Sequence, residues 1–308
     1  MKTLEGSSAV LLDNKDEISH EEWLELRRGS IGASEVAAIL GLSKWATPLS
    51  VWFSKVEGSG EEQAIPAEVG LLLEPWLLTK LPVWLMQNEG VDASVLREPH
   101  MLQHPKIPYL TCNLDGKINH PERGWGVVEA KTAGEFKANE WGEGELPDAY
   151  YCQTQAQMAV TGWSYTYVVA LIGNRKIEVR YVPRNQDFID RMVAECVAFW
   201  ENYVLTKEPP APVGEDIDTE ILKLIYEAEE AEKVVDLSHM QAEYDRYQAL
   251  NEAYKDAEKG LKELKQHFMA AMGDAEVAMV GEHKITWKTV EKKGYEVKPS
   301  KSRQLRVW

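Results

Sequence analysis

The sequence predicts an α/β (α+β) protein, with a mixed β-sheet core flanked by helices and a helical arm after the core. Helix and strand patterns alternate through the first two thirds of the chain, which is the order that builds such a core. A proline-rich stretch over residues 208–212 then reads as a linker. We therefore expect a core over residues 1–210, a helical hairpin or arm over residues 211–274, and a basic, β-rich tail over residues 275–308.

Helix start and stop signals define the expected helices of the first ninety residues. Ser19 and Glu22 form a capping box, which predicts a helix over residues 21–28 that Gly29 ends. Similar signals predict further helical segments over residues 35–40, 50–56 and 67–85. The last segment is strongly apolar, and Pro75 and Pro82 within it argue against a single straight helix.

Two arginines and a serine surround the turn between the first two helices. Arg27 and Arg28 end the first helix, and Ser34 begins the second. Backbone donors at a helix N-terminus, a hydroxyl and a guanidinium together suit a phosphate or another anion. The alternative is that Ser34 only caps its helix while both arginines face solvent.

Glu74 is one of very few charged residues in the apolar segment 67–85. A carboxylate in apolar surroundings is costly unless it is paired or bound to a metal. Glu74 therefore either belongs to a site or lies on the outward edge of an amphipathic helix, and the sequence favours neither.

Alternating apolar residues predict the sheet. A strand over residues 109–114 leads into Asp115 and Gly116, and a second strand over residues 125–131 returns after a turn. The elements expected next are a helix over residues 150–161, strands over residues 164–172 and 176–182, and a helix over residues 188–205.

Two helices are expected beyond the linker. Asp218 caps one that reaches about Val235, and Ser238 begins another that ends near Met272. The second is about 50 Å long at 1.5 Å per residue. Its apolar residues recur every three, four or seven positions, which suits either a functional arm or a solvated coiled coil. The remaining expected segments are a β-hairpin over residues 276–290 and a basic tail over residues 298–308.

The net charge of −16 argues against broad affinity for nucleic acids, because phosphate-binding proteins carry a basic footprint. The charge is unevenly distributed. Residues 211–280 hold seventeen acidic and seven basic side chains, whereas residues 281–308 hold three acidic and eight basic ones. A DNA path over residues 1–210 therefore requires a local basic strip or bound metal. Repulsion of bulk DNA also favours binding that is restricted to specific ends.

The cysteines and the hydropathy pattern indicate the cellular compartment. Cys112, Cys152 and Cys196 are odd in number and form no CxxC pair, which argues against a disulfide framework and against a zinc or iron–sulfur cluster. No stretch approaches the roughly 18 apolar residues of a membrane helix, and no signal segment opens the sequence. We expect a soluble cytoplasmic protein with no membrane partner.

The two strands around Asp115 carry the residues with the clearest chemistry. Alternate side chains of a strand share a face, so Glu129 and Lys131 point the same way while Ala130 faces the core. Asp115 and Glu129 supply carboxylates, and the Ala130 carbonyl supplies a third hard oxygen. Lys131 can orient or polarise an attacking water. Oxygen ligands without histidine or cysteine favour Mg²⁺ or Mn²⁺ over zinc. The alternative is that Glu129 and Lys131 are an ordinary pair of exposed, oppositely charged side chains.

Four motifs in chain order resemble a known family. The D…ExK pattern of residues 115–131 resembles the PD-(D/E)XK nuclease superfamily, which implies a restriction-endonuclease-like core. The set of motifs resembles the branch that contains phage lambda exonuclease and the YqaJ-type viral recombinases. The other three motifs are an Arg, a Gly and then Ala-Ser-Glu-Val within residues 26–36, a Gly-x3-Glu helix at residues 70–75, and a Tyr-x-x-Gln-x-Gln helix at residues 150–158. The resemblance spans residues 19–172.

The resemblance implies roles at the cutting site. Asp115, Glu129 and the Ala130 carbonyl would hold the metal, and Glu74 would be an auxiliary acid near it. Lys131 would help to activate water. The implied metal is Mg²⁺, for which Mn²⁺ can substitute, and two ions are expected with substrate.

The resemblance also implies how a DNA end is held. Arg27 and Ser34 would bind the 5′-phosphate, and Arg28 occupies the variable position beside them. Gln155, with Gln153 as the less favoured alternative, would position the substrate or the catalytic groups.

The implied activity is an alkaline-type exonuclease that digests one strand of linear double-stranded DNA processively from 5′ to 3′. The 3′ overhang would pass to a single-strand annealing protein in phage-type homologous recombination. The resemblance further implies a ring-shaped homotrimer and a phage or prophage protein of the bacterial host cytoplasm. The chain departs from lambda exonuclease after Pro212, where the predicted helical pair begins.

Two alternatives stay open on the sequence. One is another PD-(D/E)XK DNA nuclease, either RecB-like or an endonuclease, and the missing four-cysteine cluster argues against the iron–sulfur members. The other is a non-catalytic DNA-end-binding scaffold. The net charge of −16 favours the scaffold, whereas the intact set of Asp115, Glu129 and Lys131 argues against it.

Overall fold

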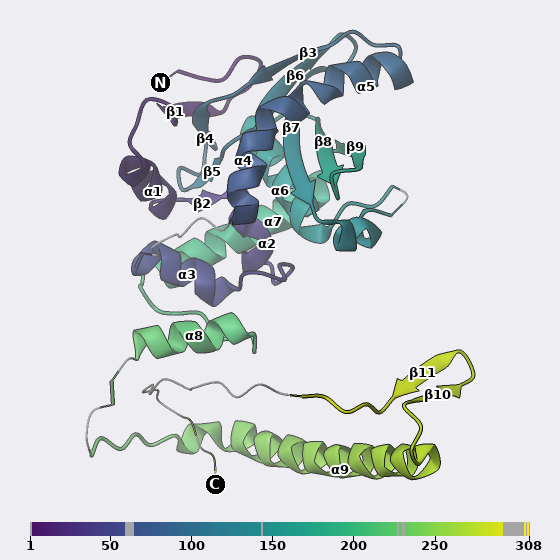
Figure 1. Ribbon diagram of the computed structural model, residues 1–308. Coiled ribbons are helices and arrows are strands. Elements are labelled where there is room, and N and C mark those ends of the chain that lie inside the picture. Colours follow the sequence, from purple (N-terminus) through teal and green to yellow (C-terminus); the bar gives the residue numbers. More distant parts are fainter. Residues whose placement is uncertain are drawn as a thin grey trace. The chain divides into compact units, whose positions relative to one another are not determined.

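The computed structural model describes residues 2–58, 65–142, 144–226, 228–229 and 232–291, together with residues 305 and 307. The chain forms two compact units, Met1–Ile225 and Tyr226–Trp308 (Figure 1). The expected basic tail lies outside the described residues except for Leu305 and Val307.

A five-stranded mixed sheet forms the centre of the first unit (Figure 1). Its order is β3-β6-β7-β8-β9; β7 and β8 run parallel, and the other neighbours run antiparallel. The strands are β3 Ser94–Arg97, β6 Gly116–His120, β7 Gly124–Ala133, β8 Tyr165–Ile172 and β9 Lys176–Pro183. The mixed sheet that the sequence predicts is thus confirmed.

A smaller sheet joins the N-terminal segment to the strand that precedes Asp115. Its order is β1-β4-β5-β2, and its strands are β1 Val10–Asn14, β4 His100–Gln103, β5 Leu110–Cys112 and β2 Ile31–Gly32. The short strand β2 pairs in parallel with β5, with Gly32 opposite Thr111. This pairing holds the turn after Arg28 close to the start of the hairpin.

The helices of the first unit surround the central sheet. They are α1 His20–Arg28, α2 Val36–Ile39, α3 Pro48–Val56, α4 Ile65–Leu78, α5 Lys80–Asn88, α6 Asp148–Thr161, α7 Gln186–Phe199 and α8 Asp216–Ile225, with short turns η1 Ala33–Glu35, η2 Glu135–Trp141 and η3 Trp200–Val204. The apolar segment that contains Pro75 and Pro82 is two helices, α4 and α5, at 44° to each other, as the two prolines suggest. No single helix among the described residues is long and apolar enough to span a membrane, and the bent pair α4 and α5 meets that test only jointly, by length and composition.

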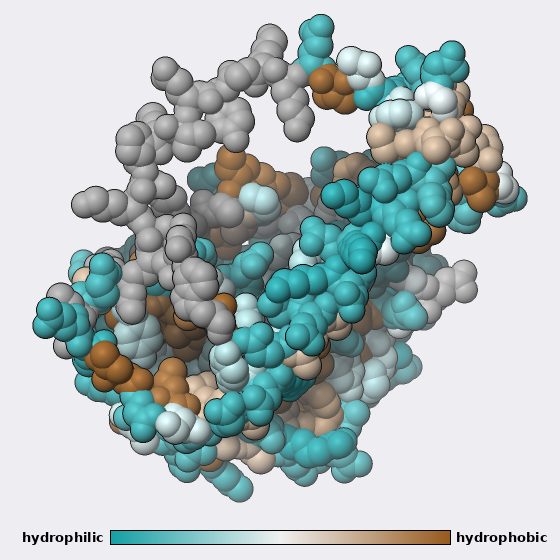
Figure 2. All heavy atoms as spheres, turned by 90° about the horizontal axis from the view of Figure 1, so that it is seen from below, coloured by the Kyte–Doolittle hydropathy of each residue, from teal (hydrophilic) through white to brown (hydrophobic). Residues whose placement is uncertain are grey.

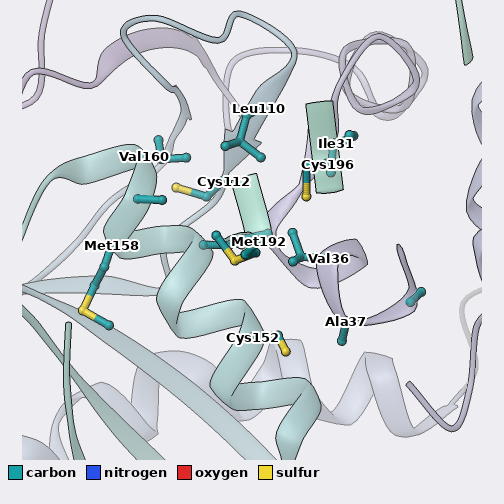
Figure 3. Close-up of a cluster of buried hydrophobic side chains, with 14 of the residues drawn as sticks. Ile31, Val36, Ala37, Leu110, Cys112, Cys152, Met158, Val160, Met192 and Cys196 are labelled. Carbon is teal, nitrogen blue, oxygen red and sulfur yellow. The ribbon is translucent and has the colours of Figure 1, made fainter. Parts of the chain in front are cut away.

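Apolar side chains pack on both faces of the central sheet. Neighbouring residues of β7 enter different clusters, because strand side chains alternate: Val127 packs in the cluster that contains α6 and α7, and Val128 packs with α4 and α5. Figure 3 shows part of the first cluster. Cys112, Cys152 and Cys196 lie there as free, buried thiols, and burial raises the pKa of Cys152 to about 11.

The helix after the proline-rich linker belongs to the first unit. In α8, Asp218 is buried and accepts hydrogen bonds from Thr47 Oγ1 at 2.5 Å and from the Val213 N–H at 2.7 Å. The division of the chain therefore falls after Ile225, and not after residue 210 where the linker suggested it. The helix also ends at Ile225, ten residues short of the end expected at about Val235.

The second unit is a long helix and a small hairpin. It contains η4 Ser238–Met240, α9 Gln241–Met272, β10 Val277–Val280 and β11 His283–Thr286. The strands β10 and β11 pair antiparallel, as the sequence predicts. Of the two helices expected beyond the linker, α8 belongs to the first unit and α9 to the second. Hydrophilic residues cover most of the face seen in Figure 2.

Candidate functional site

One cavity of about 610 Å³ is lined by most of the residues that the sequence predicts to be functional. Its lining comes from α1, η1, α4, β5, β7 and α6, with the segment that leads into β6. The predicted residues that line it are Arg27, Ser34, Glu74, Asp115, Glu129, Ala130, Lys131 and Gln153. The lining does not include Arg28 or Gln155.

The register of the hairpin places Asp115 beside β7. Pairing between β6 and β7 ends with Gly116 opposite Val128. Beyond that point Asp115 Oδ2 accepts a hydrogen bond from the Ala130 N–H at 2.7 Å. The N–H and C=O of one strand residue point to the same edge, so the Ala130 carbonyl also lies on the Asp115 side.

Gly116 allows helix α4 to approach this hairpin. A Cβ at Gly116 would lie 3.1 Å from a methyl of Leu78 and 3.1 Å from the Leu96 carbonyl oxygen. Both contacts are tighter than most Cβ contacts, so a side chain here would push Leu78 or the Leu96 carbonyl away by a few tenths of an ångström, and glycine suits the close packing. The approach brings α4, and with it Glu74, to the wall of the cavity.

Glu129 is held by three side chains. Its Oε1 accepts from Lys131 Nζ at 2.6 Å and from Gln153 Nε2 at 2.5 Å. Its Oε2 accepts from Gln157 Nε2 at 2.6 Å. Lys131 also donates to Gln153 Oε1 at 3.0 Å. The carboxylate is 2% exposed and has a fixed orientation at the cavity wall.

The glutamine that the sequence favoured faces away from the site. Gln155 donates to the Pro183 carbonyl at 2.9 Å and accepts from the Asn185 N–H at 2.9 Å, so it joins α6 to the end of β9. Helix periodicity explains the error, because a residue two positions along a helix lies on the opposite side. Gln153 and Gln157, four apart, share the face toward Glu129. That spacing was the signal by which Gln157 could have been found.

Arg27 and Arg28 differ in their contacts and in the cavities that they line. Arg28 Nε donates to the Lys55 carbonyl at 3.0 Å and Arg28 Nη2 to the Val56 carbonyl at 2.6 Å, which ties α1 to the end of α3. Both arginines line a second cavity of about 160 Å³, but Arg28 does not line the large one. Arg27 lines the large cavity, with its guanidinium carbon 4.7 Å from the centre of the Trp23 ring.

The secondary structure around Ser34 differs from the one that the sequence predicts. Residues 33–35 form the single turn η1, and α2 is only four residues long. Ser34 therefore lies inside a turn and does not cap a long helix. Gly32 is the N-cap residue, and its N–H donates to Glu35 Oε2 at 2.8 Å. The side chains of Arg27 and Ser34 are the groups at this end of the cavity that are suited to an anion.

The acidic groups of the cavity destabilise each other's charged forms. Burial raises the pKa of Asp115 well above its usual range, and the carboxylates of Glu129 and Glu74 raise it further against the opposing effect of Lys131. Burial also raises the pKa of Glu74, although Lys15 and Arg97 partly offset it. A cation among these carboxylates relieves the repulsion.

Lys131 remains protonated in this environment. Burial by itself lowers the pKa of the Lys131 ammonium, but the carboxylates of Glu129 and Asp115 outweigh burial, and the pKa is raised. An ammonium with a raised pKa donates hydrogen bonds and does not accept a proton near neutral pH. Lys131 is thus suited to orienting water or stabilising negative charge.

The oxygen atoms around Asp115 fit a hard divalent cation. No group of three or more His, Cys, Asp or Glu side chains with metal-binding geometry occurs in the described part of the chain. Two carboxylates are nevertheless supplemented by other oxygens. Asn113 lines the cavity, and its buried Oδ1 has no hydrogen-bond partner within the described structure. With the Ala130 carbonyl, this donor set is of the type that Mg²⁺ and Mn²⁺ accept.

Comparisons with known proteins give one family. The model of the YqaJ-like viral recombinase domain matches residues 22–164. The uncharacterized protein YqaJ of Bacillus subtilis strain 168 is 31% identical over 287 residues, which is 92% of this chain and 87% of that protein. Among solved structures, an alkaline exonuclease from Laribacter hongkongensis aligns with a TM-score of 0.46 and 19% identity over 67% of this chain and 97% of that chain. A phage-related exonuclease from Haemophilus somnus 129PT aligns with a TM-score of 0.41 and 14% identity over 57% and 94%.

Proposed function

This chain belongs to the family of YqaJ-like viral recombinases, and on that premise we propose that it is a Mg²⁺-dependent exonuclease acting on linear double-stranded DNA. It digests one strand from 5′ to 3′ and leaves a 3′ overhang. One observation carries the proposal: Arg27 and Ser34 line the same cavity as Asp115, Glu129 and Lys131. This shared lining supports the proposal, because the residues suited to a terminal phosphate and those suited to cutting lie in one cavity.

The cutting end of the cavity is built from hard oxygens. Asp115, Glu129 and the Ala130 carbonyl would hold Mg²⁺, and Glu74 would add negative charge at the wall. When bound, Mg²⁺ would lower the pKa of water and stabilise the negative charge that develops on the phosphodiester. A second ion, expected with substrate, would stabilise the charge on the leaving oxygen. Mn²⁺ serves the same donor set.

The side chains around the carboxylates orient the reaction. Gln153 and Gln157 fix the two oxygens of Glu129, which limits the positions that a ligand can take. Lys131 is a half-buried ammonium beside Glu129 at the cavity wall, so it orients the attacking water and stabilises negative charge on the phosphate.

The other end of the cavity selects the DNA terminus. The Arg27 guanidinium and the Ser34 hydroxyl bind the 5′-phosphate, because a planar guanidinium matches the oxygens of a phosphate group. A phosphate seated there places the next phosphodiester toward the carboxylates. Internal sites of a closed duplex offer no such terminal group, so exonuclease action is favoured over endonuclease action.

The family supports a wider role. We propose that the 3′ overhang passes to a single-strand annealing protein in phage-type recombination, and that a homotrimer encloses the DNA. Such a ring would hold DNA by topology, which suits a chain whose net charge is −16. We also propose that the protein acts in the bacterial cytoplasm.

A comparison of linear and circular DNA tests the activity. Purified protein is incubated with Mg²⁺ and either end-labelled linear duplex or the matched closed circle. We expect mononucleotides from the linear duplex, faster digestion with a 5′-phosphate than with a 5′-hydroxyl, and an intact circle. Cutting of the circle, or no digestion of either DNA, would refute the proposal. Chelation of Mg²⁺ is the matched control.

A further inference from the structure

A buried lysine lies behind the phosphate end of the cavity. Lys55, on α3, is only 6% exposed. Its Nζ donates to the Arg27 carbonyl at 2.8 Å and to Glu35 Oε1 at 2.7 Å. Lys55 does not line the large cavity, but it lines the smaller cavity of about 160 Å³ together with Arg27 and Glu35.

Glu35 connects this lysine to the phosphate site. One oxygen, Oε2, accepts from the Gly32 N–H at 2.8 Å. The other, Oε1, contacts Lys55 and lies 3.7 Å from Arg27 Nη2. A single carboxylate thus touches the backbone of the turn, the buried ammonium and the phosphate-binding guanidinium.

The position of Glu35 creates an electrostatic conflict. A carboxylate beside Arg27 is an anion that competes with an incoming phosphate for the same guanidinium. The Lys55 ammonium is 1.0 Å closer than Arg27 to the shared oxygen, by 2.7 Å against 3.7 Å, and it balances the charge of Glu35. A buried ion pair seldom improves stability over apolar side chains, so stability alone does not account for it.

Building on the function proposed above, we infer that the Lys55–Glu35 ion pair sets the affinity of the cavity for a 5′-phosphate. Glu35 orients the turn and the Arg27 side chain, and Lys55 neutralises Glu35 so that Arg27 still attracts the phosphate. Both are positioning residues: they act through Arg27 and the Gly32 backbone, and they do not touch the DNA.

This arrangement predicts effects of opposite sign for the two partners. Lys55→Met leaves Glu35 without its ammonium, so Arg27 pairs with Glu35 and the preference for 5′-phosphate ends over 5′-hydroxyl ends falls about tenfold. Glu35→Gln removes the competing anion, and the preference rises by about threefold. The double variant Lys55→Met, Glu35→Gln restores a preference close to that of the wild type.

The experiment measures kcat and KM of each full-length variant on two duplexes that differ only in the 5′-phosphate. Each variant's folding is first checked by thermal melting. A purely structural role would lower activity on both ends alike and most strongly in the double variant. The inference predicts instead that KM for the phosphorylated end changes and that kcat changes little. If Lys55→Met does not fold, Glu35→Gln and the double variant still test the predicted signs.

The outcomes separate the inference from the proposed function. If the wild type prefers 5′-phosphate ends and all three variants keep its ratio, the ion pair has no role in selecting ends, while the exonuclease function stands. If the wild type digests linear DNA without any preference, the phosphate pocket itself is refuted and the inference with it. Opposite shifts in the single variants, with recovery in the double variant, support it.

Discussion

Two lysine–glutamate pairs lie near the residues of the large cavity, and they differ in their access to a substrate: only Glu129 and Lys131 line that cavity. Lys131 and Glu129 are 2.6 Å apart, and the lysine side chain is 19% exposed at the cavity wall. Lys55 and Glu35 are 2.7 Å apart, and that lysine side chain is 2% exposed behind the wall. Similar ion pairs can therefore serve different purposes: the first faces the chemistry, and the second sets the charge around Arg27.

The two pairs also differ in how they are assembled. Glu129 and Lys131 are two positions apart on one strand, so the strand itself places them together. Lys55 and Glu35 are twenty positions apart on α3 and η1, so the pair exists only when both elements have packed. The comparison predicts that changes at the first pair stop the reaction, whereas changes at the second alter which ends are chosen.

The largest effect is expected for Lys131→Ala, which removes the only lysine that lines the large cavity in the described structure. We expect hydrolysis to fall about 10³-fold, because an electrostatic group at the reacting phosphate is lost. Binding of DNA ends should persist. Single-turnover rates and end binding by fluorescence anisotropy measure the two quantities. Lys176→Ala, at an exposed lysine of β9, is the control. An active Lys131→Ala enzyme would rule out the proposed centre.

A smaller loss is expected for Gln157→Ala, since Glu129 loses one of its three donors. Loss of such a supporting contact lowers activity about 10- to 100-fold, with KM for DNA little changed. The matched control is Gln155→Ala, which removes a contact to the backbone outside the cavity. We expect it to lower the melting temperature and to leave the rate of the folded enzyme intact. A loss of rate in Gln155→Ala, with a normal rate in Gln157→Ala, would instead support the role that the sequence predicted for Gln155.

Arg27→Ala should mainly affect the choice of ends. Loss of a charged hydrogen-bond donor lowers the preference for 5′-phosphate ends roughly tenfold, while digestion of 5′-hydroxyl ends continues. Competition between the two duplexes in one reaction gives the ratio directly. Arg28→Ala is the matched neighbour, because the Arg28 guanidinium donates to the Lys55 and Val56 carbonyls at the end of α3 and does not line the large cavity. Equal ratios for wild type and Arg27→Ala would contradict the assignment.

The smallest effect, on stability, is expected for Asp115→Asn. The folded-state pKa of Asp115 is raised, so the native protein without metal holds a proton that the unfolded chain releases as the pH rises. The stability of the metal-free protein should therefore decrease as pH rises through the window above the usual aspartate pKa. Asp115→Asn removes this dependence and raises metal-free stability by about 1 kcal/mol at neutral pH. Melting curves over pH, with and without Mg²⁺, measure both. A pH slope that Asp115→Asn leaves unchanged would contradict this origin.

The sequence predicted the local parts of the site better than the long-range parts. The hairpin of Asp115, Glu129 and Lys131 was readable because strand periodicity and a turn fix those residues relative to each other. The choice between Gln153 and Gln155 failed because the sequence does not show which helix face meets the sheet. Gln157 was missed for the same reason. The contacts of Arg28 were not predicted, because its partners are backbone carbonyls at the end of α3 and no sequence pattern indicates such a contact.

The sequence was weakest beyond the linker. Prolines at residues 208–212 suggested a boundary, yet α8 packs back onto α3 through the buried Asp218. The helical hairpin was inferred from periodicity, which predicts helices but does not show which helices become neighbours. The sequence nevertheless predicted α9, the hairpin of β10 and β11, and a helix that the structure shows, in shortened form, as α8.

The packing of α8 has a practical consequence for trimming the protein with proteases. Thr47 caps α3 and at the same time donates to Asp218, and α3 carries Lys55 at its other end. A fragment that stops at residue 210 deprives the Thr47 hydroxyl of its acceptor and uncovers the apolar surface against which Ile221 is buried. The smallest protease-resistant fragment should therefore extend to about residue 225, because α8, beyond the linker, packs on α3, and α3 carries Lys55.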